Sequence, residues 1–429
     1  MALEDVVIIG SGMAGSAAAL ALADAGRHAL VIEARGRTGG RSYSRALGGS
    51  GPLEFGGSWC TPWHDRIRAH AERFGFGLRP TLPVTERRWH DGQTLRTAQP
   101  VSDSALPAFR AAMAALAEDS LAMRNGDGRF SYGSDWASMS FADYMRAKGF
   151  PPSAQHEMMA WWAISGSADP AAANVLDVLH FASHVDGTLD GMMAVLTHTV
   201  EGGVGNLSAA MLAASGAEVR TGDAVVAITD RGDHFDLRLS SGALVQAGQV
   251  VCATALNAIR TIRFDPPLPE GPATLAAKGH VGRAVKVLAR VRGVTPGNLV
   301  TGKAHGLRWM FTERDLGDGE TLIIAFGLAD EMPDTSHAAI EAAIQTFFPE
   351  ATLIEHDFHD WNRDPFSAGT WVSHPLGLTD LFEPGVWADH PRLHFATSDI
   401  AHAETGWFEG AIIAGEAAAA AILKGSSHV

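Results

Sequence analysis

The first 33 residues predict an α/β protein that opens with a strand, a glycine-rich turn, a helix and a second strand. The stretch "DVVIIG" is a continuous apolar, β-branched run, which is typical of a buried parallel strand. It leads into "GSGMAGSAAALALADAG", a glycine-rich turn that begins a helix of small residues. The stretch "HALVIE" is a second predicted strand and ends at Glu33. This alternation predicts a Rossmann-type parallel sheet.

The glycines of the turn have the spacing of a dinucleotide site. Gly10, Gly12 and Gly15 satisfy GxGxxG between a strand and a helix, which permits a tight turn and close approach of backbone N–H groups to a pyrophosphate. Glu33 follows Gly10 by 23 residues, where such a site needs a carboxylate for the adenosine ribose hydroxyls. The sequence therefore predicts a bound dinucleotide.

The residues that follow indicate which dinucleotide. "EARGRTGGRSYS" places a Gly-Gly-Arg loop just after Glu33, and "LEFGGSW" adds a second glycine pair at Gly56 and Gly57. Such loops suit a ligand whose pyrophosphate needs a cation and whose ring system needs close backbone approach. This favours FAD over NAD.

Composition limits the class of protein. The chain has 429 residues, enough for two domains, with 46% hydrophobic and 19% charged residues. A net charge of -15 argues against nucleic-acid and anionic-membrane partners, which need a basic face. Two cysteines exclude a disulfide framework or a cysteine metal cluster. The start "MALEDVVIIGSG" is unlike a signal peptide, so a cytoplasmic protein without a membrane span is expected.

The remaining chain leaves and re-enters the dinucleotide domain. Residues 105–190 have helical spacing, and residues 217–254 alternate like strands separated by turns. A strand at 283–291 begins a second excursion, which strand 320–328 and an amphipathic helix at 336–350 continue. A late strand at 392–399 and a helix to about Leu423 end the chain.

The GxGxxG start, "EAR" followed by "GGR", and "GGSW" together resemble the flavin-containing amine oxidase family. The protein looks monoamine oxidase-like, with a pattern closest to that of 6-hydroxy-L-nicotine oxidase. The resemblance implies an α/β Rossmann-type FAD-binding domain (glutathione-reductase-like) with a discontinuous α+β substrate domain. The expected FAD-binding domain comprises residues 1–79, 199–280 and 388–429, and the substrate-binding domain comprises residues 80–198 and 281–387.

The resemblance also implies a set of FAD-binding residues, through motif positions along the whole chain. In it, Val225 contacts the adenine through its backbone, Asp399 holds the ribityl chain, and Trp361 lies near the flavin. Thr370 stands where monoamine oxidases have the cysteine that bonds to flavin, so a noncovalent FAD is expected. The full set is Gly10, Gly12, Ala14, Gly15, Glu33, Ala34, Arg35, Gly40, Arg41, Gly56, Gly57, Ser58, Trp59, Val225, Trp361, Asp399, Gly406 and Trp407.

Four residues are expected at the reaction site. Lys286 interrupts an apolar strand; by its sequence alone it suits an edge strand, but the resemblance places it near flavin N5. Trp371 and Trp407 are implied walls that sandwich the substrate, with core packing as the alternative. Trp309 is expected opposite the substrate. Trp161 and Trp162 could also line the cavity.

The implied activity is amine oxidation. Hydride would pass from the α-carbon of a hydrophobic or cyclic, nicotine-like amine to flavin N5, and water would hydrolyse the imine while O2 becomes H2O2. The alternatives are an L-amino-acid oxidase, a desaturase, an amine dehydrogenase with another acceptor, or a noncatalytic flavin-binding protein. No metal is expected, since the histidines of "EHDFHDW" do not share a strand face. A homodimer is possible.

Overall fold

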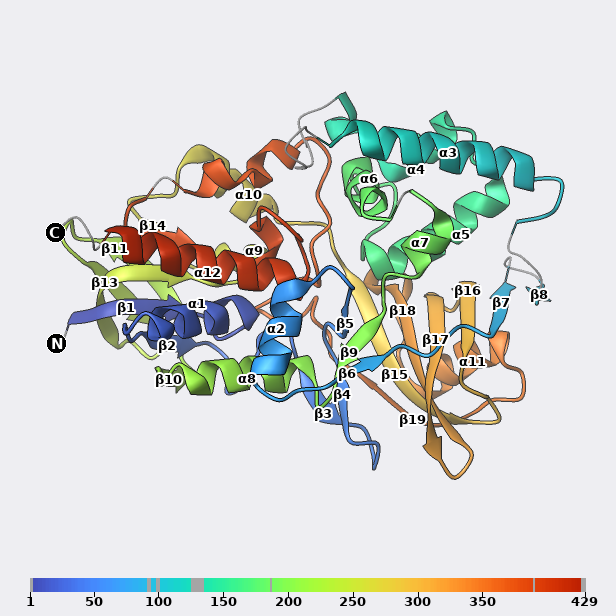
Figure 1. The fold of residues 1–429 in the computed structure, drawn as a ribbon, viewed down its shortest axis with the longest axis horizontal. Helices are drawn as coiled ribbons and strands as arrows, with labels where there is room; N and C mark the ends of the chain where they lie inside the picture. Colours follow the sequence, from blue (N-terminus) through green and yellow to red (C-terminus); the bar gives the residue numbers. More distant parts are fainter. Residues whose placement is uncertain are drawn as a thin grey trace.

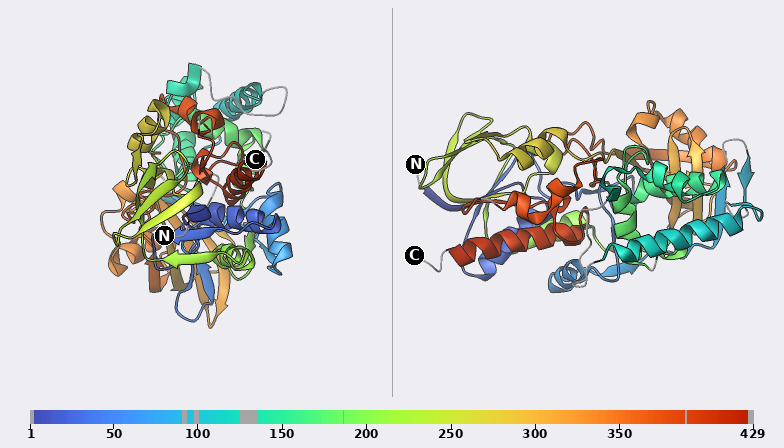
Figure 2. Two further views of the ribbon diagram at one scale, coloured as in Figure 1. Left: turned by 90° about the vertical axis from the view of Figure 1, so that its left-hand side faces the viewer. Right: turned by 90° about the horizontal axis from the view of Figure 1, so that it is seen from above.

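The computed structural model describes residues 3–90, 94–97, 101–124, 135–185, 187–388 and 390–425. It contains two large sheets side by side and a layer of helices above the second sheet (Figure 1). Both ends of the described chain lie at the end of the molecule farthest from the second sheet (Figures 1 and 2). The α/β prediction is confirmed.

The first sheet has the predicted parallel centre. Its strands run in the order β10-β2-β1-β13-β12-β11-β14, and β20 also pairs with β13. Strand β1 is parallel to both β2 and β13, with Val7 opposite Leu30 and Val250. Both central strands are buried because helices cover them, as their unbroken apolar runs predict. The bounds are β1 Leu3–Ile9, β2 Leu30–Glu33, β10 Glu218–Thr221, β11 Val225–Asp230, β12 Phe235–Leu239, β13 Leu244–Cys252, β14 Arg263–Asp265 and β20 Leu393–Phe395.

Two helices from opposite ends of the chain pack together on this sheet. Helix α1, Met13–Asp24, lies alongside α12, Phe408–Gly425 (Figure 1). Their small residues permit close contact: a Cβ on Gly415 would lie 2.2 Å from the carbonyl oxygen of Ala14. This packing brings the C-terminal segment to the glycine-rich turn. Helices α2 (Asp65–Arg73), α8 (Val204–Ala214), α9 (Leu256–Ile259) and α10 (Glu270–Lys278) complete this half.

The second sheet has the order β19-β15-β18-β17-β16-β7-β8. Its long strands are antiparallel, and Lys286 on β15 lies opposite Phe326 on β18. Helix α11, His337–Phe347, packs its apolar face on this sheet. The bounds are β7 Glu86–His90, β8 Leu95–Arg96, β15 Ala284–Arg292, β16 Asn298–Ala304, β17 Leu307–Gly317, β18 Glu320–Leu328 and β19 Thr352–Phe358.

The predicted helical insertion lies above the second sheet (Figure 1). Helix α5 contacts β16, β17 and β18, so its buried tryptophans belong to the core that joins the two layers. The helices are α3 (Leu106–Ala122), α4 (Phe141–Ala147), α5 (Pro152–Ser165), α6 (Val175–Ser183) and α7 (Leu189–Met193).

Short elements connect the two halves. The strands are β3 (Ser44–Ala46), β4 (Pro52–Glu54), β5 (Trp59–Cys60), β6 (Leu78–Pro80) and β9 (His198–Val200); the 3-10 turns are η1 (Asp135–Ser138), η2 (Ala329–Glu331), η3 (Thr379–Phe382), η4 (Pro384–Trp387) and η5 (Ser398–Ile400). Strands of the first sheet come from the expected FAD segments, and those of the second sheet from the other two segments. The exact division into two domains stays a prediction.

Candidate active site

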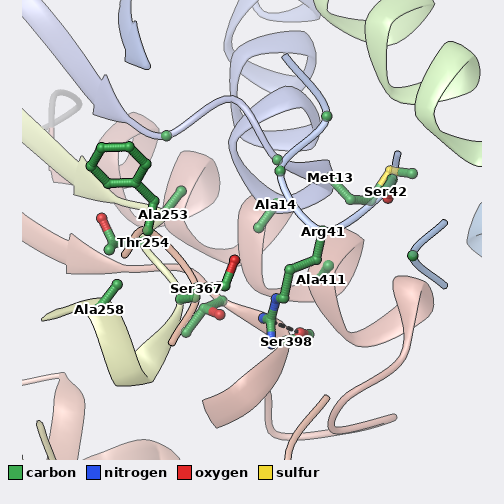
Figure 3. A pocket seen from close by; sticks show the side chains of 18 of the residues that line it. Met13, Ala14, Arg41, Ser42, Ala253, Thr254, Ala258, Ser367, Ser398 and Ala411 are labelled. Carbon is green, nitrogen blue, oxygen red and sulfur yellow. Dashed lines mark hydrogen bonds between the residues drawn. The ribbon is translucent and has the colours of Figure 1, made fainter. Parts of the chain in front are cut away.

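A long cavity, here called the dinucleotide cavity, follows the carboxyl ends of β1 and β2 and continues to the first turn of α12. Met13, Ala14 and Ala411 line one side, while Ala253, Thr254 and Ala258 line another (Figure 3). Ligands of open α/β sheets bind at this edge of the strands. The cavity therefore lies where the sequence places a dinucleotide.

The glycine-rich turn brings backbone close to the cavity. Gly12 caps α1 without a side-chain hydrogen bond, and no acidic residue occupies the first turn, so the N–H groups there remain available for an anion. Gly40 has φ of 58°, and a Cβ on it would lie 3.0 Å from the Cα of Gly12. Gly15 has a packing role, since its Cβ would lie 2.0 Å from the carbonyl oxygen of Gly10.

Glu33 lines the cavity at the end of β2 with an oriented carboxylate. Its Oε2 accepts hydrogen bonds from the backbone N and the Oγ of Ser11, at 2.8 and 2.7 Å, and Oε1 accepts one from the backbone N of Arg35 at 2.8 Å. Each carboxylate oxygen can accept two hydrogen bonds, so Oε1 retains capacity for a ribose hydroxyl.

Arg41 is held over the same cavity by three partners. Its Nη2 donates to Ser398 at 3.2 Å (Figure 3). The same Nη2 donates to Asp399 at 2.8 Å, and Nη1 donates to the carbonyl oxygen of Thr370. Burial alone would raise the pKa of Asp399, but the Arg41 guanidinium and His280 hold that pKa below its usual value. Arg41 thus supplies a fixed cation for a pyrophosphate or another anionic ligand.

Lys286 lies in the wall of the dinucleotide cavity and holds the loop before Trp59. Its Nζ donates to the carbonyl oxygens of Glu54 and Gly56, at 2.6 and 3.0 Å, and to the Oγ of Ser58. Burial lowers the pKa of Lys286 to about 8, against the opposing effect of the Glu54 carboxylate. The expected edge-strand alternative does not apply, because β15 lies between β18 and β19.

A second cavity, here called the aromatic cavity, adjoins the first. Both are lined by Gly56, Gly57, Trp371, Gly406, Trp407 and Phe408. The further aromatic residues that line only the aromatic cavity are Trp59, Trp63, Trp162, Phe181 and Phe326. Trp371 packs edge-to-face on Phe326 at 6.1 Å between ring centroids, and Trp407 stacks near Phe181 at 6.4 Å.

Histidines and carboxylates form the polar side of the aromatic cavity. Burial lowers the pKa of His180 to about 3 and also lowers that of His184, so both imidazoles are neutral near pH 7. Asp177 accepts hydrogen bonds from the backbone N of His374, at 2.7 Å, and from its Nδ1. Glu404 completes this side.

The structure brings most of the expected site residues together. Fourteen of the expected FAD-binding positions line the dinucleotide cavity, as do Lys286 and Trp371; the fourteen are Gly10, Gly12, Ala14, Glu33, Ala34, Arg35, Gly40, Arg41, Gly56, Gly57, Val225, Trp361, Gly406 and Trp407. Ser58 and Trp59 line the aromatic cavity, where Trp162 joins them. Gly15 and Asp399 lie behind the dinucleotide cavity lining, the first against Gly10 and the second against Arg41. Their individual roles stay predictions.

Two tryptophans lie elsewhere. Trp309 on β17 is 4% exposed, packs in the core beneath the helical layer and lines neither cavity. Trp161 is 1% exposed and also lines neither cavity.

Sequence reasoning missed the polar side of the aromatic cavity. His180, His184, His374 and Glu404 come from three separate segments, so no local spacing connects them. Only Glu404 carried a signal, since it begins the "ETGWFEG" segment that also supplies Gly406 and Trp407. The pairing of His356 with His359 in a metal site is absent among the described residues, which contain no cluster suited to a metal.

The fold and the dinucleotide cavity are those of a dinucleotide-binding α/β protein, with an aromatic-lined cavity beside the dinucleotide cavity. Residues 13–423 match the family model of flavin-containing amine oxidoreductases, and the chain belongs to this family. It is an FAD-dependent enzyme, and the uncapped helix terminus, Glu33 and Arg41 fit that cofactor.

Two curated relatives match nearly the whole chain. (S)-6-hydroxynicotine oxidase of Paenarthrobacter nicotinovorans is 29% identical over 98% of this chain and 100% of its own. Pseudooxynicotine dehydrogenase of a Pseudomonas species is 26% identical over 99% of this chain and 87% of its own.

Solved structures share the fold. Cyclohexylamine oxidase from Brevibacterium oxydans superposes with a TM-score of 0.83 at 22% identity, covering 99% of this chain and 100% of its own. Putrescine oxidase with bound putrescine gives 0.82 at 23% identity, covering 99% of both chains. In the part of the chain that the structure describes, none of the helices has the length and apolarity needed to span a bilayer.

Proposed function

We propose that the protein is an FAD-dependent amine oxidase whose substrate occupies the aromatic cavity between Trp371 and Trp407. The observation that carries this proposal is the wall shared by the two cavities, which includes both tryptophans and three glycines. Glycines let a bound ring system approach the backbone, and tryptophans present apolar faces to the substrate. A substrate there would lie against the end of the dinucleotide cavity.

The chemistry that FAD supplies when bound is acceptance of a hydride from the amine α-carbon and return of the two electrons to O2, giving H2O2, or to another acceptor. The chain's own residues bind and orient the amine. Aromatic walls disfavour the charged form of the reacting nitrogen, so the amine binds there unprotonated and keeps its lone pair to support cleavage of the C–H bond. Water then hydrolyses the iminium product.

The lining favours a hydrophobic or cyclic amine, as the nicotine-oxidising relatives by name also suggest. The amino-acid oxidase alternative needs an arginine for a substrate carboxylate. Arg308 is instead paired with Glu331 at 2.6 Å, and the side chain of Arg363 is 90% exposed. Neither arginine lines a cavity.

The proposal includes a noncovalent FAD. Cys60 and Cys252 are buried and line neither cavity, and burial raises the pKa of both thiols, that of Cys60 to about 11. Acid or heat precipitation should release yellow flavin into the supernatant, whereas flavin left in the washed pellet would contradict this point. A cytoplasmic homodimer is part of the same proposal, and sedimentation of the holoenzyme with cell fractionation tests it.

An anaerobic amine screen tests the activity. Secondary, primary and tertiary amines should be mixed with the purified holoenzyme while flavin absorbance is recorded. Bleaching by a cyclic or aromatic amine, followed by recovery and H2O2 formation on admission of air, is expected. Bleaching with recovery only on addition of another acceptor would replace the oxidase with a dehydrogenase, and no bleaching by any amine would refute amine oxidation.

A further inference from the structure

Glu404 occupies an unusual place in the aromatic cavity. It lies between η5 and α12, three residues before Trp407, and its side chain is 16% exposed in the cavity wall. Its φ of 51° falls in the left-handed region, which glutamate seldom adopts. A residue kept in such a conformation beside a cavity points to a role for its side chain.

The Glu404 carboxylate is ionised. Burial alone would raise its pKa, but the hydrogen bond that Glu404 accepts from His64 Nε2, at 3.1 Å, holds that pKa below its usual value. Among the described basic side chains, only the imidazoles of His64 and His184 come within 4.0 Å of the Glu404 carboxylate.

The hydrogen-bond network assigns the tautomers of both histidines. The backbone N–H of Thr61 donates to His64 Nδ1 at 3.2 Å, so the single proton of a neutral His64 is on Nε2 and is donated to Glu404. Arg124 donates to His184 Nδ1 at 3.3 Å, which likewise places the His184 proton on Nε2. His64 therefore orients the Glu404 carboxylate without neutralising its charge, whereas His184 Nε2 lies 4.0 Å from that carboxylate and 3.4 Å from His180 Nε2.

The cavity thus retains a negative charge with spare acceptor capacity. Among the described hydrogen bonds, Glu404 Oε2 accepts one and Oε1 accepts none. Neither lysine nor arginine is among the described residues that line the aromatic cavity. Asp177, the other lining carboxylate, is already engaged by Ser373 and by both the backbone and the ring of His374.

We infer that Glu404 binds a second, protonated nitrogen of the substrate, so that the preferred substrates are dibasic amines. This inference rests on the proposed function of the aromatic cavity. One nitrogen lies between Trp371 and Trp407 and reacts in its neutral form, while the other forms a charge-assisted hydrogen bond with the carboxylate. The protonated nitrogen at Glu404 helps to keep the reacting nitrogen neutral, because a bound ammonium lowers the pKa of a nearby amine. Trp63, stacked on His184 at 5.5 Å, adds an aromatic face beside the cation.

Matched ligand pairs test the inference on the holoenzyme. One pair is 4-(aminomethyl)piperidine and cyclohexylmethylamine, which differ by one ring nitrogen; the other is 1,4-diaminobutane and pentylamine. Anaerobic calorimetry measures binding and stopped-flow absorbance measures flavin reduction. The dibasic member of at least one pair should bind roughly ten- to hundredfold more tightly, the range of a charge-assisted hydrogen bond.

Glu404→Gln keeps the side-chain shape and removes the charge. It should abolish the dibasic preference by weakening dibasic binding far more than monoamine binding, and Glu416→Gln, on α12 and outside both cavities, should preserve the preference. If Glu404→Gln weakens binding of the dibasic amine and of the monoamine equally, the inference is overturned, and Glu404 instead contacts the reacting nitrogen. A dibasic preference that is unchanged in Glu404→Gln would also overturn the inference, as would the lack of any such preference in the unmutated enzyme. If Glu404→Gln loses flavin, the inference is tested instead by the dibasic preference of the unmutated enzyme and of Glu404→Asp, which keeps the charge.

Binding and reduction separate the two proposals. Dibasic binding that depends on Glu404 without flavin reduction would refute amine oxidation and leave the charge site standing. Reduction by monoamines without any gain from a second nitrogen would refute the charge site and leave amine oxidation standing.

Discussion

The dinucleotide cavity and the aromatic cavity differ in whether backbone or side chains form them. The dinucleotide cavity depends on backbone: glycines at positions 10, 12, 40 and 56, an uncapped helix terminus, and a few fixed side chains. The aromatic cavity depends on side chains that the segment 56–63, α5, α6, β18 and the C-terminal segment bring together. A backbone site needs particular residues at fixed spacing, whereas a side-chain site can be assembled from any segments that the fold makes adjacent. The difference predicts that mutations in the two cavities fail in different ways.

The largest effect on flavin binding should come from a side chain added to the glycine-rich turn of the dinucleotide cavity. Gly15→Val should abolish flavin binding, because even a Cβ would lie 2.0 Å from the carbonyl oxygen of Gly10. The purified protein should be colourless. The ratio of absorbance at 450 nm to that at 280 nm measures the flavin content, which should be about zero. Gly36→Ala is the control, since Gly36 has open space around its Cβ position. A yellow Gly15→Val protein would show that the turn tolerates a side chain.

Removing the aromatic walls should spare the cofactor. Trp371→Ala and Trp407→Ala should retain flavin and lower the efficiency of flavin reduction by about 100-fold, because both residues are only partly buried and line the aromatic cavity, the proposed substrate site. Stopped-flow reduction and thermal melting measure the two properties.

The matched control is Trp161→Ala. Trp161 is 1% exposed in the core, so its truncation should cost about 3–5 kcal/mol of unfolding free energy. Wall variants that melt as early as Trp161→Ala and purify without flavin would mean that Trp371 and Trp407 are core residues.

Glu33→Ala should weaken the dinucleotide cavity without closing it. Loss of a charge-assisted hydrogen bond costs about 1.5–3 kcal/mol, or roughly 10- to 100-fold in the FAD dissociation constant. Fluorescence titration of apoprotein with FAD measures this change. Undiminished affinity would remove Glu33 from the cofactor site.

The smallest effect concerns Lys286, which belongs to the wall of the dinucleotide cavity. Its pKa of about 8 means that it carries a positive charge below pH 8 and loses that charge as the pH rises through this value. A cation in the wall favours electron gain nearby, so the midpoint potential of bound flavin should fall more steeply above pH 8 than below it.

Lys286→Met should bind FAD and lack this inflection, with flavin reduction or reoxidation slower by about tenfold. Spectroelectrochemical titration at several pH values measures the potential. An identical pH dependence in the variant, with unchanged rates in both half-reactions, would remove Lys286 from the redox chemistry.

The sequence alone determined the N-terminal part of the dinucleotide cavity. The spacing of Gly10, Gly12 and Gly15 and the distance to Glu33 are local properties of one strand–turn–helix–strand unit, and the fold places them together without help from distant residues. The burial of β1 and β2 followed from their unbroken apolar runs for the same reason.

Only the tertiary structure decided the polar side of the aromatic cavity and the place of Trp309. Contact between Glu404 and His64 joins residues 340 positions apart, and no periodicity encodes such a pairing. Trp309 and Trp371 are both tryptophans, yet one packs in the core and the other lines the aromatic cavity. Hydrophobic burial is non-directional, so a tryptophan's identity predicts that it packs but not against what.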